Sequence, residues 1–314
     1  MAEAERPTLE ELGEIAVLGR IFPRLPEAEA TLLGPGDDAA LLAAPDGRYV
    51  VTTDMLIHGP DFRWEFSTPE DLGWKAAATN LSDVAAMGAR PTALVVALAA
   101  PATTPVDVLE SFADGLRLGC AQLAPGCGVV GGDLSTSDVF TIAVTAFGDL
   151  EGRAPVRRSG ARPGDAVAVA GELGVAARGL RLLFEQGRAD ALRADAHAVG
   201  RQLRPAPPIA LGTVAADAGA TAMMDISDGL VLDARRLAQA SRVDLELDDL
   251  GDDALRGGED HSLLATFPGD VPVPEGFRRI GSVVAGEGRV LVRGAEYDAL
   301  GGWDPYEQWD GRLS

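Results

Sequence analysis

Apolar positions near the amino terminus recur with helical spacing. Thr8 is followed three residues later by Glu11, which is the spacing of a capping box, so we predict that a helix begins here. The apolar side of this helix would consist of Leu9, Leu12, Ile15 and Leu18. A stretch rich in glycine, proline and aspartate follows and predicts turns before the first long strand.

A second helix start lies at residues 68–71. Thr68 supplies a capping hydroxyl, Pro69 occupies the first helical position, and two acidic residues follow near the positive end of the helix dipole. The helix is predicted to continue through Lys75 and Asp83 and to end before Gly88. Lys75 is the only lysine in the sequence, which we interpret as a compositional preference for arginine.

Short apolar runs alternate with helical patterns along the rest of the chain. The predicted strands are residues 49–53, 92–99, 140–147, 166–170 and 221–226, and the predicted helices between them include residues 106–122 and 230–240. The first of these strands is predicted to end at Asp54. Because strands and helices alternate in both halves, the sequence predicts a mixed α/β (α+β) fold. An arginine-, glycine- and proline-rich connector begins at Glu151, so we predict two domains, residues 1–150 and 151–314.

Composition and charge restrict the class of protein. A chain of 314 residues is long enough for two domains, and 46% hydrophobic with 24% charged residues is typical of a folded protein. The net charge of −21 disfavours nucleic acid and anionic membrane surfaces as partners. The acidic, amphipathic start is unlike a signal peptide, and apolar runs such as residues 93–100 are too short to cross a bilayer. We therefore expect a cytoplasmic protein in which Cys120 and Cys127 are free thiols.

Several acidic residues stand beside glycines or at the ends of predicted strands. They are Asp37, Asp38, Asp54, Asp83, Asp133, Asp225, Asp228, Glu259 and Asp260. Carboxylates held near a sheet cost desolvation energy unless a cation or hydrogen-bond donors compensate, and oxygen ligands without histidine or thiolate are typical of Mg²⁺ sites. Any single acid could instead be a turn or cap residue, and Asp228 is placed to cap a helix that starts at Gly229. As a set, they predict metal binding.

Familiar nucleotide and hydrolase motifs are absent from the sequence. There is no GxxxxGK[ST] phosphate loop, no GxSxG and no HExxH. Gly34, Gly36 and Ala39 imitate a dinucleotide fingerprint, but no predicted strand precedes them and a strand-like run follows. A function based on these motifs is therefore excluded.

Six motifs in one order carry a resemblance to a known family. GDDAA, TTD, NLSDVAAMGARP, GGD, DISDGL and GGEDH resemble the thiamine-monophosphate kinase family, which belongs to the ATP-binding superfamily of aminoimidazole ribonucleotide synthetase. The resemblance runs from about Gly34 to Trp303. It implies two mixed α/β domains and a homodimer whose amino-terminal sheets pair across the interface. The amino-terminal domain would bind ATP and Mg²⁺ and dimerise, and the carboxy-terminal domain would complete the active site.

The resemblance also implies roles for the residues at matching positions. The implied magnesium ligands are Asp38, Thr53, Asp54, Asp83, Asp133, Asp225 and Asp228. The implied ATP contacts are Gly132, Asp133, Arg158 and Ser227, and the implied substrate contacts are Asp61, Glu259 and Trp303. Arg158 could equally be a surface charge of the connector, and Trp303 could equally anchor the end of the chain. The family usually has histidine where Asp61 stands, and the stretch between Leu247 and GGED is shorter than the family pattern.

The implied activity is phosphorylation of thiamine monophosphate by ATP, by direct in-line transfer in a site with several Mg²⁺ ions. A substrate phosphate with a second pKa of about 6 is already ionised, so no general base and no catalytic residue beyond the metal ligands is expected. Cations would offset the repulsion between the two anions, which is about 4 kcal/mol for two unit charges about 4 Å apart at an effective dielectric near 20. Two alternatives stay open: another ATP-dependent synthetase of the superfamily, and a non-catalytic acidic protein that binds metals but no nucleotide.

Overall fold

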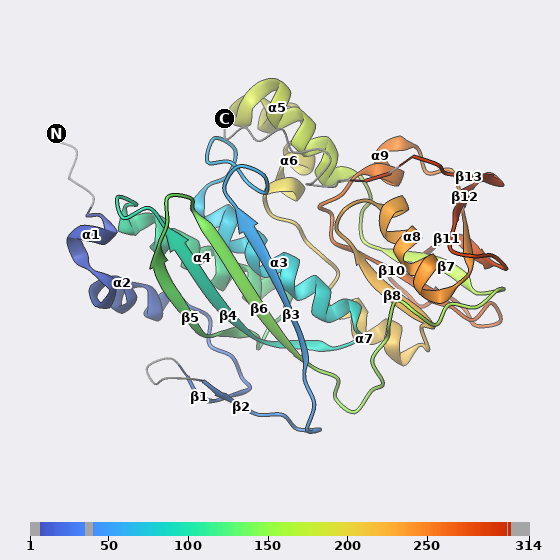
Figure 1. The fold of residues 1–314 in the computed structure, drawn as a ribbon, viewed down its shortest axis with the longest axis horizontal. Coiled ribbons are helices and arrows are strands. Elements are labelled where there is room, and N and C mark those ends of the chain that lie inside the picture. The colour runs from blue at the N-terminus through green and yellow to red at the C-terminus, as the bar shows by residue number, and fades with distance from the viewer. Residues whose placement is uncertain (1–6, 35–39, 300, 303–314) are drawn as a thin grey trace.

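Two large β-sheets organise the chain (Figure 1). The computed structural model describes residues 7–34, 40–299 and 301–302. A four-stranded sheet has the order β3 (Val50–Ile57), β6 (Thr141–Asp149), β4 (Arg90–Ala100) and β5 (Gly128–Thr136), and its β4 and β5 run parallel. A seven-stranded, mainly antiparallel sheet has the order β13 (Ala295–Glu296), β12 (Val290–Val292), β9 (Asp244–Leu247), β11 (Arg278–Val284), β7 (Ala166–Ala170), β10 (Ser262–Phe267) and β8 (Ala222–Ile226). The mixed α/β class predicted from the sequence is confirmed.

Helices cover one face of the four-stranded sheet. α3 (Pro69–Ala86) and α4 (Val106–Leu123) pack there, and the opposite face is turned toward the viewer in Figure 1. Apolar side chains such as Leu81 of α3, Leu94 of β4 and Ile142 of β6 form the core between these layers. The small elements before this sheet are α1 (Leu9–Leu12), α2 (Glu14–Ile21), a 3₁₀ turn (Phe22–Arg24) and the hairpin of β1 (Thr31–Leu33) and β2 (Leu41–Leu42).

Helices lie on both faces of the seven-stranded sheet. α8 (Leu230–Ser241) packs against one face, while α7 (Ala210–Asp217) and Ala86 of α3 pack against the other. The remaining helices are α5 (Val175–Ala194), α6 (Ala196–Leu203) and α9 (Asp252–Arg256). Because α3 contacts both sheets, it is the element that can align residues from the two halves of the chain. In the described ranges, no helix combines the length and apolar character that crossing a membrane requires.

Local capping signals were read correctly from the sequence. The Asp71 amide donates to Thr68 Oγ1 at 3.1 Å, and the Thr68 amide donates to Asp71 Oδ2 at 3.0 Å, so α3 begins with a capping box as predicted. The α3 segment ends before Gly88, whose φ of 73° lies in the left-handed region. Strand β7 has the predicted limits, and α8 begins at the predicted Leu230.

Two predicted elements were wrong in their limits. The first strand does not end at Asp54, because β3 pairs with β6 along its whole length, from Val50 opposite Gly148 to Ile57 opposite Thr141. The amino-terminal helix is broken at Gly13, where φ is 73°, and Ile15 is 88% exposed rather than on the apolar side. In both cases, tertiary pairing or a local backbone turn overrides the apolar spacing.

The close crossing of α3 and α4 depends on two glycines, and this gives a stability prediction. A Cβ atom on Gly73 would lie 2.0 Å from the Phe112 carbonyl oxygen, and one on Gly115 would lie 2.1 Å from the Glu70 carbonyl oxygen. We expect Gly73→Ala to lower the free energy of unfolding by about 1–3 kcal/mol, because backbone atoms cannot easily move away. Gly200→Ala on α6, where the added Cβ meets nothing within 4 Å, is the matched control and should keep or raise the wild-type melting temperature. An unchanged melting temperature for Gly73→Ala would contradict this reading of the helix contact.

Candidate active site

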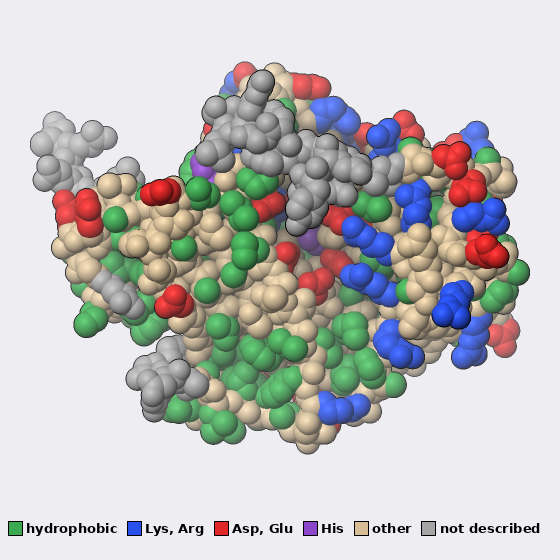
Figure 2. Space-filling model, in the orientation of Figure 1, with side chains coloured by type: hydrophobic (Ala, Val, Ile, Leu, Met, Phe, Trp, Pro, Cys, Tyr) green, Lys and Arg blue, Asp and Glu red, His purple; other side chains and the backbone are tan. Residues whose placement is uncertain are grey.

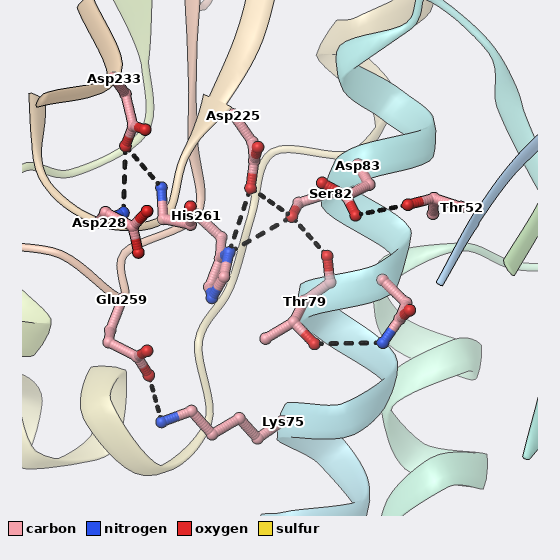
Figure 3. A network of polar contacts seen from close by, with 12 residues as sticks. Thr52, Lys75, Thr79, Ser82, Asp83, Asp225, Asp228, Asp233, Glu259 and His261 are labelled. Carbon is pink, nitrogen blue, oxygen red and sulfur yellow. Dashed lines mark hydrogen bonds and ion pairs between the residues drawn. The ribbon is translucent and has the colours of Figure 1, made fainter. Parts of the chain in front are cut away.

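Helix α3 brings together polar side chains from both sheets (Figure 3). On one side, Ser82 Oγ lies 3.1 Å from Asp225 Oδ2 at the end of β8. Asp83, the next residue, accepts a hydrogen bond of 2.9 Å from Thr52 Oγ1 of β3. Neighbouring residues of one helix therefore connect the two halves of the chain.

The carboxylates of Asp54, Asp83 and Asp225 lie close enough to interact electrostatically, and we call these three residues the acidic group. Burial and the negative charges of Asp225 and Asp54 together raise the pKa of Asp83 to about 6, against the opposing effect of the Thr52 hydrogen bond. Burial also raises the pKa of Asp54, and the charges of Glu259 and Asp225 act in the same direction. These acids therefore form a region of uncompensated negative charge, which a cation would stabilise.

His261 lies at the edge of this acidic group. Its Nδ1 is 3.3 Å from Asp225 Oδ2 and 3.4 Å from Ser82 Oγ, while its Nε2 is buried without a hydrogen-bond partner. Burial lowers the pKa of His261, but the hydrogen bond and charge of Asp225 and the charge of Glu259 outweigh this and raise it overall. The His261 side chain is 6% exposed and lies between Asp225 and the ion pair described next.

An ion pair with a buried lysine joins α3 to the GGEDH turn. The Lys75 ammonium contacts Glu259 Oε2, and the Lys75 side chain is 5% exposed. Burial opposes ionisation of Glu259, but the charges of Lys75 and His261 hold its pKa below the usual value. The turn is fixed from behind, because the Glu259 amide donates to the Ser227 carbonyl at 2.7 Å and the His261 amide donates to the Ile226 carbonyl at 3.1 Å.

A cavity of about 730 Å³ opens beside this ion pair. Asp61, Lys75, Ser227 and Glu259 supply polar groups to its wall, and Phe66, Leu183, Phe184 and Leu203 supply an apolar side. Asp61 is held by the Ile57 amide, which donates to its Oδ2 at 2.7 Å, and burial raises the pKa of this carboxyl. Figure 2 shows acidic side chains and a histidine in a hollow between the two halves, with arginines along one margin. The cavity can accept a ring system together with charged groups.

The DISDG turn is held by a buried acid further along α8. The amides of Ser227 and Asp228 both donate to Asp233 Oδ2 at 3.1 Å. Arg236 Nη1 lies 2.6 Å from Asp228 Oδ2 and 2.6 Å from Asp233 Oδ1. Asp228 does not cap α8, whose N-cap residue Gly229 has no side chain. Asp228 is instead paired with a guanidinium.

The remaining residues implied by the resemblance lie either away from the acidic group or outside the described part of the chain. The Thr53 side chain lies on the face of β3 opposite Asp54, and its Oγ1 donates to the Val144 carbonyl. The threonine that contacts Asp83 is therefore Thr52, not Thr53. Gly132 and Asp133 lie on β5, at the other edge of the four-stranded sheet from β3, and line a second, largely apolar pocket of about 440 Å³. Arg158 is exposed on the connector. Asp38 and Trp303 lie outside the described residues.

A divalent cation fits the chemistry of the acidic group, but needs more ligands than the group supplies in this arrangement. Among the described residues, no three Asp, Glu, His or Cys side chains are placed to hold a metal ion by themselves. The donors of Asp54, Asp83 and Asp225 are nevertheless hard oxygens, and burial together with neighbouring negative charge raises the pKa of Asp54 and of Asp83. Mg²⁺ commonly takes one or two carboxylates and completes its shell with water and phosphate oxygens. The residues present therefore fit Mg²⁺ that arrives with phosphate.

Sequence reasoning missed four of the polar residues around the site. In the sequence analysis, Lys75 was assigned to composition, and His261, Ser82 and Asp233 were given no role in the site. A signal existed for Lys75 and Ser82: they are seven residues apart, two helical turns, on a helix that also carries Asp83. The short stretch before GGED contains the small helix α9. Its residues Asp252, Asp253 and Arg256 form part of the cavity wall.

Comparison with known proteins decides the family. The family described as AIR synthase related protein, N-terminal domain, matches residues 36–150. The thiamine-monophosphate kinase of Mycobacterium tuberculosis is 44% identical over 330 residues, covering 99% of this chain and 96% of that protein. The chain belongs to the thiamine-monophosphate kinase family. The resemblance inferred from six motifs is thereby confirmed.

Solved structures of other family members share the fold over most of the chain. The thiamine-monophosphate kinase of Stenotrophomonas maltophilia has 36% identity and a TM-score of 0.77, covering 91% of this chain and 98% of that one. The structure described as AaThiL complexed with AMPPCP and TMP has 35% identity and a TM-score of 0.74, covering 95% of this chain and 98% of that one. A member of this thiamine-monophosphate kinase family has thus been observed with an ATP analogue and TMP together.

Proposed function

We propose that this chain transfers the γ-phosphoryl group of ATP to thiamine monophosphate, giving thiamine diphosphate and ADP. The observation that carries the proposal is the meeting of Asp83 of α3 and Asp225 of β8, on which the charge of Asp54 of β3 also acts, next to a cavity with apolar and charged walls. Family membership at 44% identity over nearly the full length supports the same reaction. Of the two alternatives, the non-catalytic acidic protein offers no reason for the adjoining cavity, and the other synthetases are disfavoured by the family match.

The acidic group would hold Mg²⁺ where the two phosphate-bearing substrates meet. Asp54, Asp83 and Asp225 are the proposed ligands from the group itself, and Asp38, Thr53, Asp133 and Asp228 are further proposed ligands at motif positions. When bound, Mg²⁺ neutralises charge on the phosphoryl oxygens and aligns attack. Thr52 and Ser82 orient the carboxylates of Asp83 and Asp225 by hydrogen bonds at 2.9 and 3.1 Å. Arg236 contacts Asp228 through Oδ2, so Oδ1 of the same carboxylate is the proposed metal-binding oxygen.

The large cavity is the proposed site of thiamine monophosphate. Asp61 and Glu259 line it and offer negative charge to the cationic thiazolium ring, and the Phe66 and Phe184 side offers apolar contact to the rings. Trp303 is proposed as a further ring contact. The ATP base is placed in the pocket of β5, beside Gly132 and Asp133, with Arg158 and Ser227 as additional ATP contacts.

A homodimer is proposed because one chain does not bring all of these residues together. β6 and β4 lie between β3 and β5, so Asp133 is roughly 14 Å of sheet away from the strand of Asp54. The face of the four-stranded sheet opposite α3 carries exposed apolar side chains, including Val51 at 59% and Met55 at 51% exposure. Figure 2 shows this apolar surface on the face turned toward the viewer. Pairing of two such faces would cover it, and in this proposal it brings β5 of a second copy, which carries Asp133, toward β3, the strand that carries Asp54.

In this proposal, residues 1–150 bind ATP and Mg²⁺ and form the dimer, and residues 151–314 complete the site with Asp225, Asp228 and Glu259. The assay that tests the function is incubation of the purified chain with ATP, Mg²⁺ and thiamine monophosphate, followed by chromatography. Equal amounts of thiamine diphosphate and ADP are expected. ADP without thiamine diphosphate, or no turnover in a folded preparation, would refute the assignment.

Subunit complementation tests the shared site. Asp54→Asn and Asp133→Asn should each be inactive alone, and co-expressed chains should recover about a quarter of wild-type activity, because half of the dimers are mixed and each mixed dimer has one intact site. Light scattering should give twice the 32.5 kDa mass of one chain. No recovery in mixed dimers of the correct mass would place Asp54 and Asp133 in the same protomer's site.

A further inference from the structure

The Lys75 ammonium is a buried cation that no motif role accounts for. Its side chain is 5% exposed, and it lies on α3 two turns before Ser82. A buried ammonium must be surrounded by acceptors, and two are present. Glu259 Oε2 is the first. The second is Gln202 of α6, whose amide oxygen lies 3.3 Å from Lys75 Nζ when its nitrogen donates to the Ala176 carbonyl at 3.2 Å.

The backbone of Glu259 is fixed, whereas its side chain needs a separate anchor. Glu259 and His261 have φ values of 70° and 51°, in the left-handed region that costs free energy for residues other than glycine. The turn is held there by hydrogen bonds to the DISDG segment, and a Cβ on Gly258 would lie 2.5 Å from the Ser227 carbonyl oxygen. This rigidity ends at Cα, because a glutamate side chain still has three rotatable bonds.

Lys75 supplies that anchor from the opposite wall. Its Nζ contacts the buried Oε2 atom of Glu259, while the Glu259 side chain as a whole keeps 39% exposure and lines the cavity. A carboxylate held through one oxygen can present the other to a ligand. Figure 3 shows the pair bridging the space between α3 and the GGEDH turn, below the ring of His261.

The charge balance of the cavity wall also depends on Lys75. Asp61 and Glu259 are acids on the same wall as Lys75, which pairs with Glu259. Without Lys75, two carboxylates would repel each other, and Glu259 would be drawn toward solvent or toward Mg²⁺.

We propose that Lys75 is a positioning and specificity-determining residue, which fixes the Glu259 carboxylate so that the cavity recognises the cationic ring of the substrate. This inference rests on the proposed function, since it assigns the cavity to thiamine monophosphate. Lys75 does not touch the reacting phosphates in this account. Its removal should therefore weaken binding of the thiamine substrate and leave ATP binding almost unchanged.

The test measures binding of thiamine monophosphate and of a non-hydrolysable ATP analogue separately, by calorimetry, and KM and kcat by product formation. Lys75→Met should raise the Kd and KM for thiamine monophosphate by about tenfold to a hundredfold, as expected for loss of a hydrogen bond between charged groups. The Kd of the ATP analogue should change less than about twofold. Arg117→Met on α4, an exposed cation paired with Asp114, controls for the loss of one positive charge and should behave as wild type.

A double-mutant cycle separates positioning from a general structural effect. If Lys75 acts through Glu259, then Lys75→Met combined with Glu259→Gln should bind thiamine monophosphate no more weakly than Glu259→Gln alone. Lys75→Gln, which keeps a hydrogen-bond donor, replaces Lys75→Met if the latter does not fold. Unchanged affinity for thiamine monophosphate, additive losses in the double variant, or equal loss of ATP-analogue binding would each overturn the proposal. A wild-type protein that binds no thiamine monophosphate would instead refute the proposed function itself.

Discussion

Replacing Asp54 by asparagine is expected to lower kcat by about a hundredfold or more while the protein stays folded. Asp54 lies on β3 and faces α3. Its negative charge and that of Asp225 both raise the pKa of Asp83. Asparagine keeps the shape but removes the charge that a metal requires, and a metal ion contributes several kcal/mol of charge stabilisation in phosphoryl transfer. Steady-state assays at saturating ATP and thiamine monophosphate measure this directly.

Asp190→Asn is the matched control for Asp54→Asn. Asp190 is an exposed carboxylate on α5 that pairs with Arg193, so the same chemical change there should leave kcat at the wild-type value. Raised Mg²⁺ should recover part of the Asp54→Asn activity if affinity for the metal is what is lost. Wild-type kcat in Asp54→Asn, with the control unchanged, would remove the acidic group from the mechanism.

Affinity for Mg²⁺ is expected to fall about tenfold for each pH unit below 6. Burial, Asp225 and Asp54 raise the pKa of Asp83 to about 6 in the metal-free protein. Only the ionised carboxylate binds a metal, so below this pKa a proton must first leave, while above pH 7 the same group adds no pH dependence. Calorimetric titration with Mg²⁺, without nucleotide, at pH 5, 6, 7 and 8 gives the profile.

Thr52→Val sharpens the pH test. The Thr52 hydroxyl donates to Asp83 Oδ2 at 2.9 Å and lowers the pKa of that carboxyl. Its removal should raise this pKa, so the loss of Mg²⁺ affinity should begin at a higher pH than in the wild type. Equal affinity at pH 5 and pH 8, or the same profile in Thr52→Val, would show that Asp83 does not control metal binding.

Local elements could be predicted because their signals lie within a few residues. The Thr68 capping box, the buried run of β7 and the turn before α8 all have sequence signatures that tertiary contacts reinforce. The length of β3 had no such signal. Thr52, Asp54 and Met55 continue as a strand because β6 offers partners through Ile57, and that pairing is set by residues 141–148, far away in the sequence.

The acidic group was predicted as a set, but its membership required coordinates. Residue types and neighbouring glycines point to Asp54, Asp83 and Asp225, whereas strand alternation decides that Thr52 rather than Thr53 faces Asp83. A strand predicted only as far as residue 53 leaves that alternation undetermined. The Lys75–Glu259 pair joins positions 184 residues apart, so neither spacing nor composition could reveal it.

The central claim is that carboxylates from both halves of the chain hold divalent cations between two anionic substrates. Crystals grown with Mn²⁺, a non-hydrolysable ATP analogue and thiamine monophosphate test it through anomalous scattering. We expect a Mn²⁺ peak within about 2.5 Å of carboxylate oxygens of at least two of Asp54, Asp83 and Asp225, and in contact with phosphate. Both ligands bound with no peak at these carboxylates would contradict it.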